Sequence, residues 1–434
     1  MHRLFTNCTL ITCDPEDSVL SADLRVRDGR IAEIGAALVP GDAEVIDLRG
    51  AWLMPGLVQT HIHLVQTLFR GMADDLALMD WLRTRVWPLE AAHDVDSVYW
   101  SARLGVSELL LGGTTAILDM GTVHHTDATF EACAQAGIRA HIGRAMMDRP
   151  NEAGLSQPTD ASLRGACDEA DRWHGKHPRL AYAFAPRFVP SCTDELLTAV
   201  VAEARARGCL IHTHASENRD EVKLVREMTG RENIEHLHAL GMTGPDVCLA
   251  HCIHLTDNEE AILAATGTRV CHCPSSNLKL ASGIARIPEL MARGVHVSIG
   301  ADGAPCNNRL DAFTEMRTAA LIQKPRLGPT AMPAAVTLRA GTRSGAEALG
   351  LNAGSLEVGR EADLVALAPD RLASLPAPDP IAAIVYAMSP ANVTDVWIGG
   401  EQVVADSQVV AWDQAATVAG VGVAFRRVRE RAGV

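Results

Sequence analysis

The 434-residue chain carries 53 acidic and 39 basic side chains, which gives a formal net charge of −14. This negative balance argues against nucleic acid or an anionic membrane surface as a partner. Aromatic residues make up only 4% of the chain, so a stacking platform for single-stranded nucleic acid is not expected.

The cysteines predict a reducing compartment. Several of the 11 cysteines lie inside apolar runs, among them Cys209, Cys248 and Cys271, which fits packed thiols better than a disulfide framework. The first residues lack the apolar core of a signal peptide, and the longest apolar run is too short to span a bilayer. We therefore expect a cytoplasmic protein without a membrane segment.

Both ends of the chain read as β-structure. Near the start, Leu24–Val26 and Ile31–Ile34 flank Asp28-Gly29, a strong hairpin signal. Near the end, Asp363–Leu367 and Val393–Ile398 are similar apolar runs. We expect a small composite β-sandwich domain from residues 1–54 plus 355–434, with a separate domain over residues 55–354.

Between these ends, short apolar runs alternate with helical stretches. Eight such runs over roughly 300 residues predict a (β/α)8 barrel. An open doubly wound sheet is the alternative, but the glycine-rich phosphate loop that usually follows its first strand is missing. The eight runs are Leu57–His61, Thr115–Met120, Arg139–Met146, Leu180–Ala185, Leu210–His214, Val247–His251, Thr268–Cys273 and His296–Asp302.

Metal-binding residue types stand at the ends of four of these runs. His61 and His63 are two positions apart on the first strand, so both rings point the same way. His214, His251 and Asp302 end the fifth, sixth and eighth strands. Because the carboxyl ends of barrel strands meet at one rim, we expect a site for a dication such as Zn2+ there.

Two further patterns resemble metal-binding motifs, but we do not expect them to bind a metal. We expect His236-Leu237-His238 to lie on a helix, where this spacing separates the rings, and we interpret both as surface histidines. Cys271-His272-Cys273 is expected to pack within the seventh strand.

The segment Met54–His63 resembles the opening strand of the amidohydrolase superfamily. The blocks His214–Glu217, Leu249–Leu255, Pro274–Leu280 and Gly300–Gly303 resemble its branch of adenosine-type deaminases and triazine chlorohydrolases. Within that branch, the chain is most similar to 5′-methylthioadenosine/S-adenosylhomocysteine and 5′-deoxyadenosine deaminases. The resemblance runs over nearly the whole chain.

The resemblance implies roles for the rim residues. His61, His63, His214 and Asp302 would be the metal ligands, and Asp302 would also accept a proton from the attacking water. The resemblance makes Glu217 the proton shuttle and His251 a group beside that water. Strand four lacks the lysine that bridges two metals in binuclear relatives, so we expect one ion, Zn2+, with Fe2+ or Mn2+ as alternatives.

The resemblance also implies a substrate. Glu90 matches the glutamate that holds the ribose hydroxyls, and Trp81 would form part of the pocket wall, although an ordinary buried aromatic is an equal alternative. Arg187 stands where relatives have a histidine that contacts the purine, so the base contacts must differ. We expect conversion of a 5′-modified adenosine to its inosine analogue and ammonia.

Several alternatives stay open. Guanine or 8-oxoguanine deamination and triazine chlorohydrolysis are possible on the same fold, and a catalytically silent metal-binding scaffold is possible in a different class. The sequence lacks the motifs of polynucleotide zinc deaminases and of serine hydrolases. Arg139, Arg144 and Arg149 are expected to be surface charges, and we expect a homo-oligomer acting on a small nucleoside.

Overall fold

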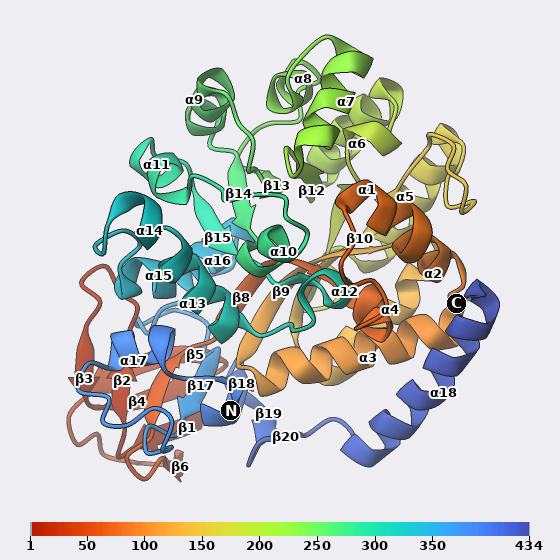
Figure 1. Cartoon of the computed structure of the whole chain (residues 1–434). Coiled ribbons are helices and arrows are strands. Elements are labelled where there is room, and N and C mark those ends of the chain that lie inside the picture. Colours follow the sequence, from red (N-terminus) through yellow and green to blue (C-terminus); the bar gives the residue numbers. More distant parts are fainter. Residues whose placement is uncertain (1, 434) are drawn as a thin grey trace.

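Parallel strands at the centre of the molecule form a barrel surrounded by helices (Figure 1). The computed structural model describes residues 2–433. Each strand pairs in parallel with the next from β8 to β15, and the short β16 pairs with β8, which confirms the predicted (β/α)8 fold. The strands are β8 Leu57–His63, β9 Thr114–Thr122, β10 Arg139–Met146, β11 Leu180–Pro186, β12 Leu210–Ala215, β13 Val247–His251, β14 Arg269–His272, β15 Val297–Ile299 and β16 Asp302–Gly303.

Helices follow the strands and cover the outside of the barrel (Figure 1). The apolar faces of helices and strands share one large buried core. The main helices are α3 Val95–Leu111, α4 Thr126–Ala136, α5 Thr159–Trp173, α6 Asp194–Arg207, α7 Arg219–Thr229, α8 Asn233–Ala239, α9 Asp257–Thr266, α10 Pro274–Lys279, α11 Ile287–Ala292, α13 Ala312–Ile322, α15 Ala334–Ala340 and α16 Arg343–Ala348.

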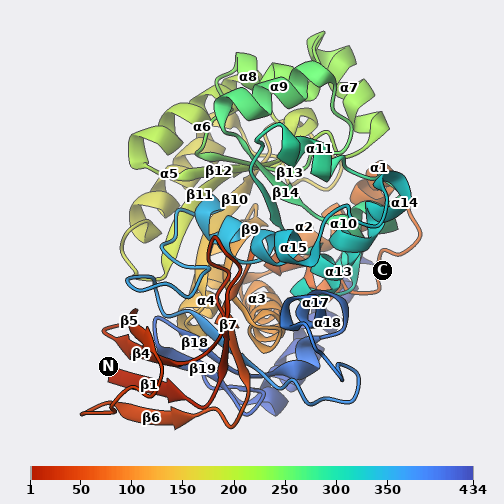
Figure 2. The same cartoon turned by 90° about the vertical axis from the view of Figure 1, so that its left-hand side faces the viewer.

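Residues from both ends of the chain build two smaller sheets below the barrel (Figure 2). The predicted hairpin at Asp28-Gly29 is present, with both residues in the left-handed region (φ 51° and 80°), as a tight two-residue turn requires. One sheet has the order β5-β4-β1-β6: Arg30–Gly35, Asp23–Arg27, His2–Thr6 and Glu44–Asp47. The other has the order β20-β19-β18-β17-β7-β2-β3: Gln408–Val409, Glu401–Ala405, Val393–Ile398, Leu364–Leu367, Trp52–Pro55, Thr9–Ile11 and Val19–Ser21.

A shared core joins these two sheets. Phe5 of β1 and Trp397 of β18 are fully buried, with ring centroids 4.9 Å apart in an edge-to-face arrangement. The same cluster contains Leu53 and Leu364 from the neighbouring strands β7 and β17. The expected β-sandwich from both termini is therefore present. The last helix, α18 (Gln414–Ala432), leaves these sheets and packs along α3 of the barrel (Figure 1).

The expectation of surface charges is wrong for Arg139 and Arg144, which form ion pairs with buried carboxylates. Arg139 is buried and donates to both oxygens of Asp363, at 2.7 and 3.0 Å, which ties the barrel strand β10 to the terminal sheet. Arg144 pairs with the buried Glu169, and Arg149 donates to the carbonyl of Cys192 at 2.9 Å.

Within residues 2–433, no helix is long and apolar enough to cross a membrane.

Candidate active site

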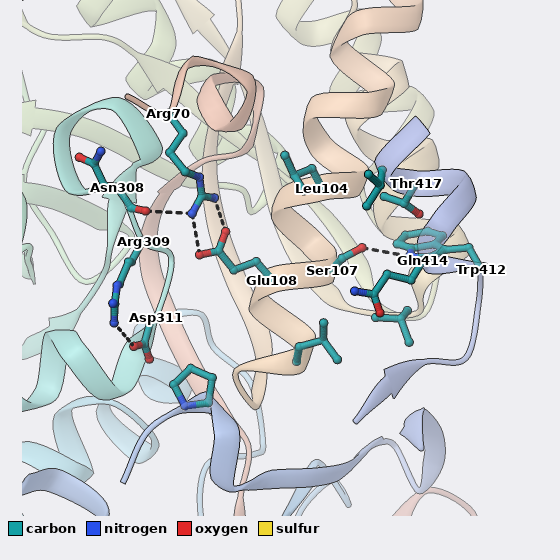
Figure 3. A pocket seen from close by; sticks show the side chains of 14 residues that line it. Arg70, Leu104, Ser107, Glu108, Asn308, Arg309, Asp311, Trp412, Gln414 and Thr417 are labelled. Carbon is teal, nitrogen blue, oxygen red and sulfur yellow. Dashed lines mark hydrogen bonds and ion pairs between the residues drawn. The ribbon is translucent and has the colours of Figure 1, made fainter. Parts of the chain in front are cut away.

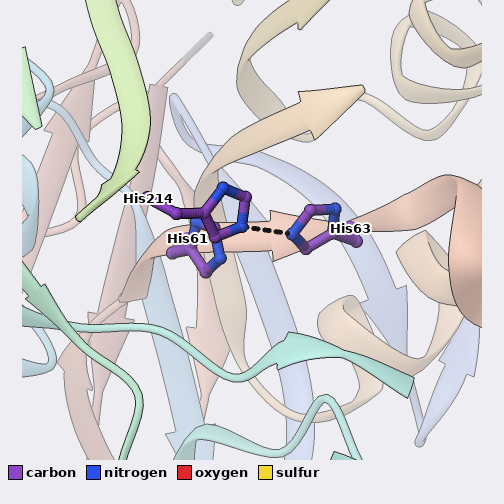
Figure 4. Close-up of side chains that lie close together, drawn as sticks. All are labelled: His61, His63 and His214. Atoms are coloured by element: carbon purple, nitrogen blue, oxygen red, sulfur yellow. Dashed lines mark hydrogen bonds between the residues drawn. The ribbon is translucent and has the colours of Figure 1, made fainter. Parts of the chain in front are cut away.

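Three histidines from two strands meet at the carboxyl end of the barrel (Figure 4). His61 and His63 lie on β8, and their shared direction follows from their two-residue spacing. Nε2 of His63 lies 3.2 Å from Nε2 of His214, the last residue but one of β12. One ring nitrogen from each of the three histidines lies within 4.8 Å of the others.

Asp302 brings a carboxylate to the same point. Its Oδ1 lies 3.3 Å from Nε2 of His61 and 3.3 Å from Nε2 of His63. Gly300 makes this approach possible, because a Cβ at that position would lie 2.6 Å from the carbonyl oxygen of His61. The hydroxyl of Ser276 donates to Oδ2 of Asp302 at 2.6 Å and fixes the carboxylate from α10.

Left-handed backbone turns place the other rim residues. His251 and Asp302 have φ values of 74° and 63°, and Ser216, just before Glu217, has φ 53°. Such conformations are uncommon for residues with a Cβ and occur where the surrounding structure holds them in place. Each turn directs a side chain from the end of its strand toward the histidine cluster.

Hydrogen bonds at the Nδ1 atoms orient the rings. Nδ1 of His61 lies 2.7 Å from Nε2 of His212, and Nδ1 of His214 donates to the carbonyl of Arg187 at 2.7 Å. Nδ1 of His251 lies 2.8 Å from the side-chain oxygen of Asn277. When Nδ1 carries the proton of a neutral imidazole, Nε2 is left with its lone pair directed into the site.

The charges of the cluster suit a cation. Burial lowers the pKa of His63 and of His214 well below the ordinary value, so both rings are neutral. Burial by itself would raise the pKa of Asp302, but His61 and His251 hold it well below its ordinary value, so this carboxylate is ionised. Neutral imidazoles and an ionised carboxylate are the states in which these groups bind metals.

Glu217 lies beside this cluster. Its Oε2 is 3.6 Å from Nε2 of His251, whose Nε2 is also 3.8 Å from Oδ2 of Asp302. Burial raises the pKa of Glu217 to about 7. For His251, burial by itself would lower the pKa, but Glu217 and Asp302 raise it above the ordinary value. With this pKa, Glu217 can hold and transfer a proton near neutral pH.

The donor set fits a divalent metal. Nε2 of His61 and Nε2 of His251 are both buried without a hydrogen-bond partner, a costly situation for polar atoms in a protein interior. Imidazole nitrogens and a carboxylate oxygen are ligand types that zinc takes, and with four protein ligands an attacking water would be the fifth. His61, His63, His214 and Asp302 could hold such an ion, and among the described residues both candidate metal clusters lie here.

A buried ion pair stands at one wall of the site. Nη1 of Arg187 donates to Oε2 of Glu90 at 2.6 Å, and Nη2 donates to Oε1 at 3.1 Å. The amide of Gln66 also donates to Oε1 of Glu90, at 2.8 Å. Both oxygens of Glu90 are therefore engaged within the protein, while Arg187 and Gln66 face the cavity.

The cavity beside the cluster has a volume of about 30 Å3, which is room for one or two water molecules. Trp81 lines it together with Leu78 and Leu82 of the segment after the first strand. Phe188 lines both this cavity and a larger neighbouring one of about 530 Å3. A molecule much larger than water can therefore enter only if the covering side chains move.

Sequence reasoning missed several residues that contact the site, and one interpretation is wrong. His212 stands two residues before His214 on the same strand, so strand alternation could have indicated it. Gln66 lies in the short helix after the first strand, where alternation does not apply. His236 on α8 is buried and lies 3.0 Å from Asp194, although we expected a surface residue; His238 is exposed as expected.

A second sizeable cavity, about 500 Å3, lies away from the rim between α3 and α18 (Figure 3). Arg70 and Glu108 form an ion pair at one side, and Nε1 of Trp412 donates to the hydroxyl of Ser107 at 3.0 Å on the other. Because both metal clusters among residues 2–433 lie at the barrel rim, we locate the chemistry there.

The barrel, the strand-end histidines and the aspartate define a hydrolase of the metal-dependent barrel class. Residues 52–403 match the model of the amidohydrolase family, and the chain belongs to this family. The chain is 41% identical to a 5′-deoxyadenosine deaminase of Methanothermobacter thermautotrophicus, over 88% of this chain and 89% of the relative. It is 37% identical to a 5-methylthioadenosine/S-adenosylhomocysteine deaminase of Syntrophobacter fumaroxidans, over 94% of both.

A solved structure shows the same similarity in three dimensions. An adenosine deaminase from Xanthomonas campestris, crystallised with bound zinc, superposes with a TM-score of 0.93 at 34% identity, covering 98% of each chain. The expected family and fold are therefore confirmed.

Proposed function

We propose that this protein is a hydrolytic deaminase that converts a 5′-modified adenosine to the inosine analogue and ammonia. One observation carries the proposal: carboxylate oxygens of Glu217 and Asp302 both lie close to Nε2 of His251, at 3.6 and 3.8 Å, next to the three clustered histidines. The names of the relatives agree with this chemistry.

His61, His63, His214 and Asp302 would hold one divalent ion, for which we propose Zn2+. When bound, the ion would polarise a water molecule so that it can attack a ring carbon at neutral pH. Glu217, with a pKa of about 7, would donate a proton to the ring nitrogen next to that carbon. Asp302 would accept a proton from the water and pass it to the departing amine, which leaves as ammonia, and His251 would orient the attacking water.

The larger cavity next to Phe188 has room for a substituent on the 5′ carbon of an adenosine substrate. Its lining includes the charged residues Arg83, Arg149 and Glu152 together with further polar and apolar side chains. A base near the histidine cluster and a ribose beside Phe188 would direct the 5′ group into this space. A cytoplasmic location and a homo-oligomeric assembly stay predictions.

A second candidate is deamination of a free purine base such as guanine. It is favoured by the engagement of both Glu90 oxygens by Arg187 and Gln66, which leaves that carboxylate no free face for a ribose diol. Nucleoside binding through Glu90 would require it to exchange one of these partners for the ribose hydroxyls.

Ammonia release separates these proposals. The zinc-loaded protein is assayed with 5′-deoxyadenosine, 5′-methylthioadenosine, S-adenosylhomocysteine, adenosine and guanine. The main proposal predicts the highest kcat/KM for a 5′-modified adenosine, whereas a preference for guanine supports the second candidate. Ammonia from none of the five would contradict both. The Glu90→Ala variant should lose the preference for nucleosides over free bases. If the preference is unchanged, Glu90 does not bind the ribose.

A further inference from the structure

Glu221 lies in the first turn of α7 and is buried. Its carboxylate accepts three successive backbone N–H groups: Ser216 at 3.2 Å, Glu217 at 2.6 Å and Asn218 at 3.3 Å. A fourth donor, the side-chain amide of Asn233 on α8, reaches Oε1 at 2.6 Å. The loop that carries the proposed proton donor is therefore attached to one buried carboxylate.

The Glu217 side chain has much weaker anchors than its backbone. Its carboxyl has only a 3.5 Å contact from the hydroxyl of Ser282 and a 3.6 Å approach to His251. The preceding residue, Ser216, is in the left-handed region, so the chain bends sharply between β12 and Glu217. The direction of the Glu217 side chain consequently depends on how this bend is held.

A helix cap by itself does not need this arrangement. In a capping box, the glutamate at the third helical position accepts the N–H of the capping residue, here Asn218. Glu221 accepts two further N–H groups that lie outside the helix. On α9, Glu259 occupies the matching position, is equally buried, and binds the N–H groups of Thr256 and Ile234, neither of which adjoins Glu217 in the chain.

We propose that Glu221 is a positioning residue that fixes the backbone of Ser216 and Glu217 and thereby aims the Glu217 carboxyl at the reacting ring. Glu221 does not line the substrate cavity. This inference rests on the proposed function for its kinetic consequence. A displacement of about 1 Å in a reacting group can cost about 100-fold in rate.

The test compares Glu221→Gln with Glu259→Gln. An amide keeps the volume but replaces one acceptor oxygen with a donor that opposes the loop N–H groups. Glu221→Gln should lower kcat about 10- to 100-fold, with KM and metal content near wild type. Glu259→Gln should lower the free energy of unfolding comparably but keep the wild-type kcat. An equal effect of both variants on kcat would overturn the proposal.

Non-additivity provides the second readout. In a Glu217→Gln background, adding Glu221→Gln should change kcat little, because Glu221 acts through Glu217. If Glu221→Gln lowers kcat in that background as much as it does in the wild type, Glu221 has a role that does not act through Glu217. If Glu221→Gln does not fold, Asn233→Ala removes only one of the four donors and should give a smaller loss of kcat; wild-type kcat in that variant would count against the proposal.

Hydrogen exchange distinguishes this inference from failure of the proposed function. The amides of Ser216, Glu217 and Asn218 should exchange faster in Glu221→Gln and stay protected in Glu259→Gln, whatever the substrate is. Absence of ammonia release by the wild type would refute the deaminase proposal only. Unchanged protection of these amides in Glu221→Gln would refute the positioning role.

Discussion

Arg187 and Glu90 form a doubly hydrogen-bonded ion pair at the wall of the site, with both side chains removed from solvent. Removing one partner from a buried pair leaves an uncompensated charge, which typically costs about 3–5 kcal/mol. We therefore expect Glu90→Ala to lower the free energy of urea unfolding by about that amount. Glu90→Leu combined with Arg187→Met should recover most of the loss. A double variant less stable than Glu90→Ala would contradict this account.

Replacing Glu217 tests the proton donor directly. A glutamine in its place cannot deliver a proton, so Glu217→Gln should lower kcat by about 100- to 10,000-fold. Bound metal and the thermal midpoint should stay near wild type, because the Glu217 side chain is not among the proposed ligands. Ser282→Ala, which removes only the 3.5 Å contact, serves as the control and should have a small effect. Retention of a large fraction of activity by Glu217→Gln would show that another group supplies the proton.

His212 should determine metal affinity although it is not itself a proposed ligand. Its Nε2 lies 2.7 Å from Nδ1 of His61. Removing a hydrogen-bond partner of a metal-binding histidine typically weakens metal affinity about 10- to 100-fold. We expect His212→Phe to weaken zinc binding by that factor in a competition titration with a chelator. His236→Phe removes a buried imidazole elsewhere and should bind zinc as the wild type does. Equal affinities in the two variants would rule out an orienting role.

Glu315 predicts a pH dependence of stability. This buried residue accepts from the backbone of Ser275 at 3.2 Å and the amide of Asn307 at 2.9 Å, and burial raises its pKa from 4.5 to about 7. Between these pH values the folded state holds a proton that the unfolded state has released, so stability falls as pH rises from 4.5 to 7.

Glu315→Gln removes that titration. The fall in the free energy of unfolding over this window should become smaller by up to about 3 kcal/mol. Urea unfolding at several pH values from 5 to 8 measures the difference between the two proteins. Parallel curves would show that Glu315 has the same pKa in the folded and unfolded states.

The strand pattern was sufficient to predict the fold and the histidine cluster. Alternation and apolar runs are local features, and a barrel brings the carboxyl ends of its strands to one rim whatever the details of packing. His61, His63, His214 and Asp302 could therefore be placed together from their positions at strand ends, and the structure brings their side chains within reach of one another.

Side-chain partners could not be predicted in the same way. Arg187 and Glu90 are 97 residues apart, and Arg139 and Asp363 are 224 apart. The sequence around Arg187 and around Arg139 shows no pattern that distinguishes a buried ion pair from a surface charge. Their pairing depends on how separate elements rotate and pack against each other, which local periodicity does not encode.

The amino-acid sequence by itself determined which residues stand at the barrel rim, because strand length and side-chain alternation are set by neighbouring residues. Only the tertiary structure decided which side chains near the rim are already bound within the protein, as Glu90 is by Arg187 and Gln66. It also decided that Glu221, which binds the backbone of Glu217, is itself held by Asn233 of another helix. The physical reason is that a buried polar group must find its partner among all the chain segments that fold around it.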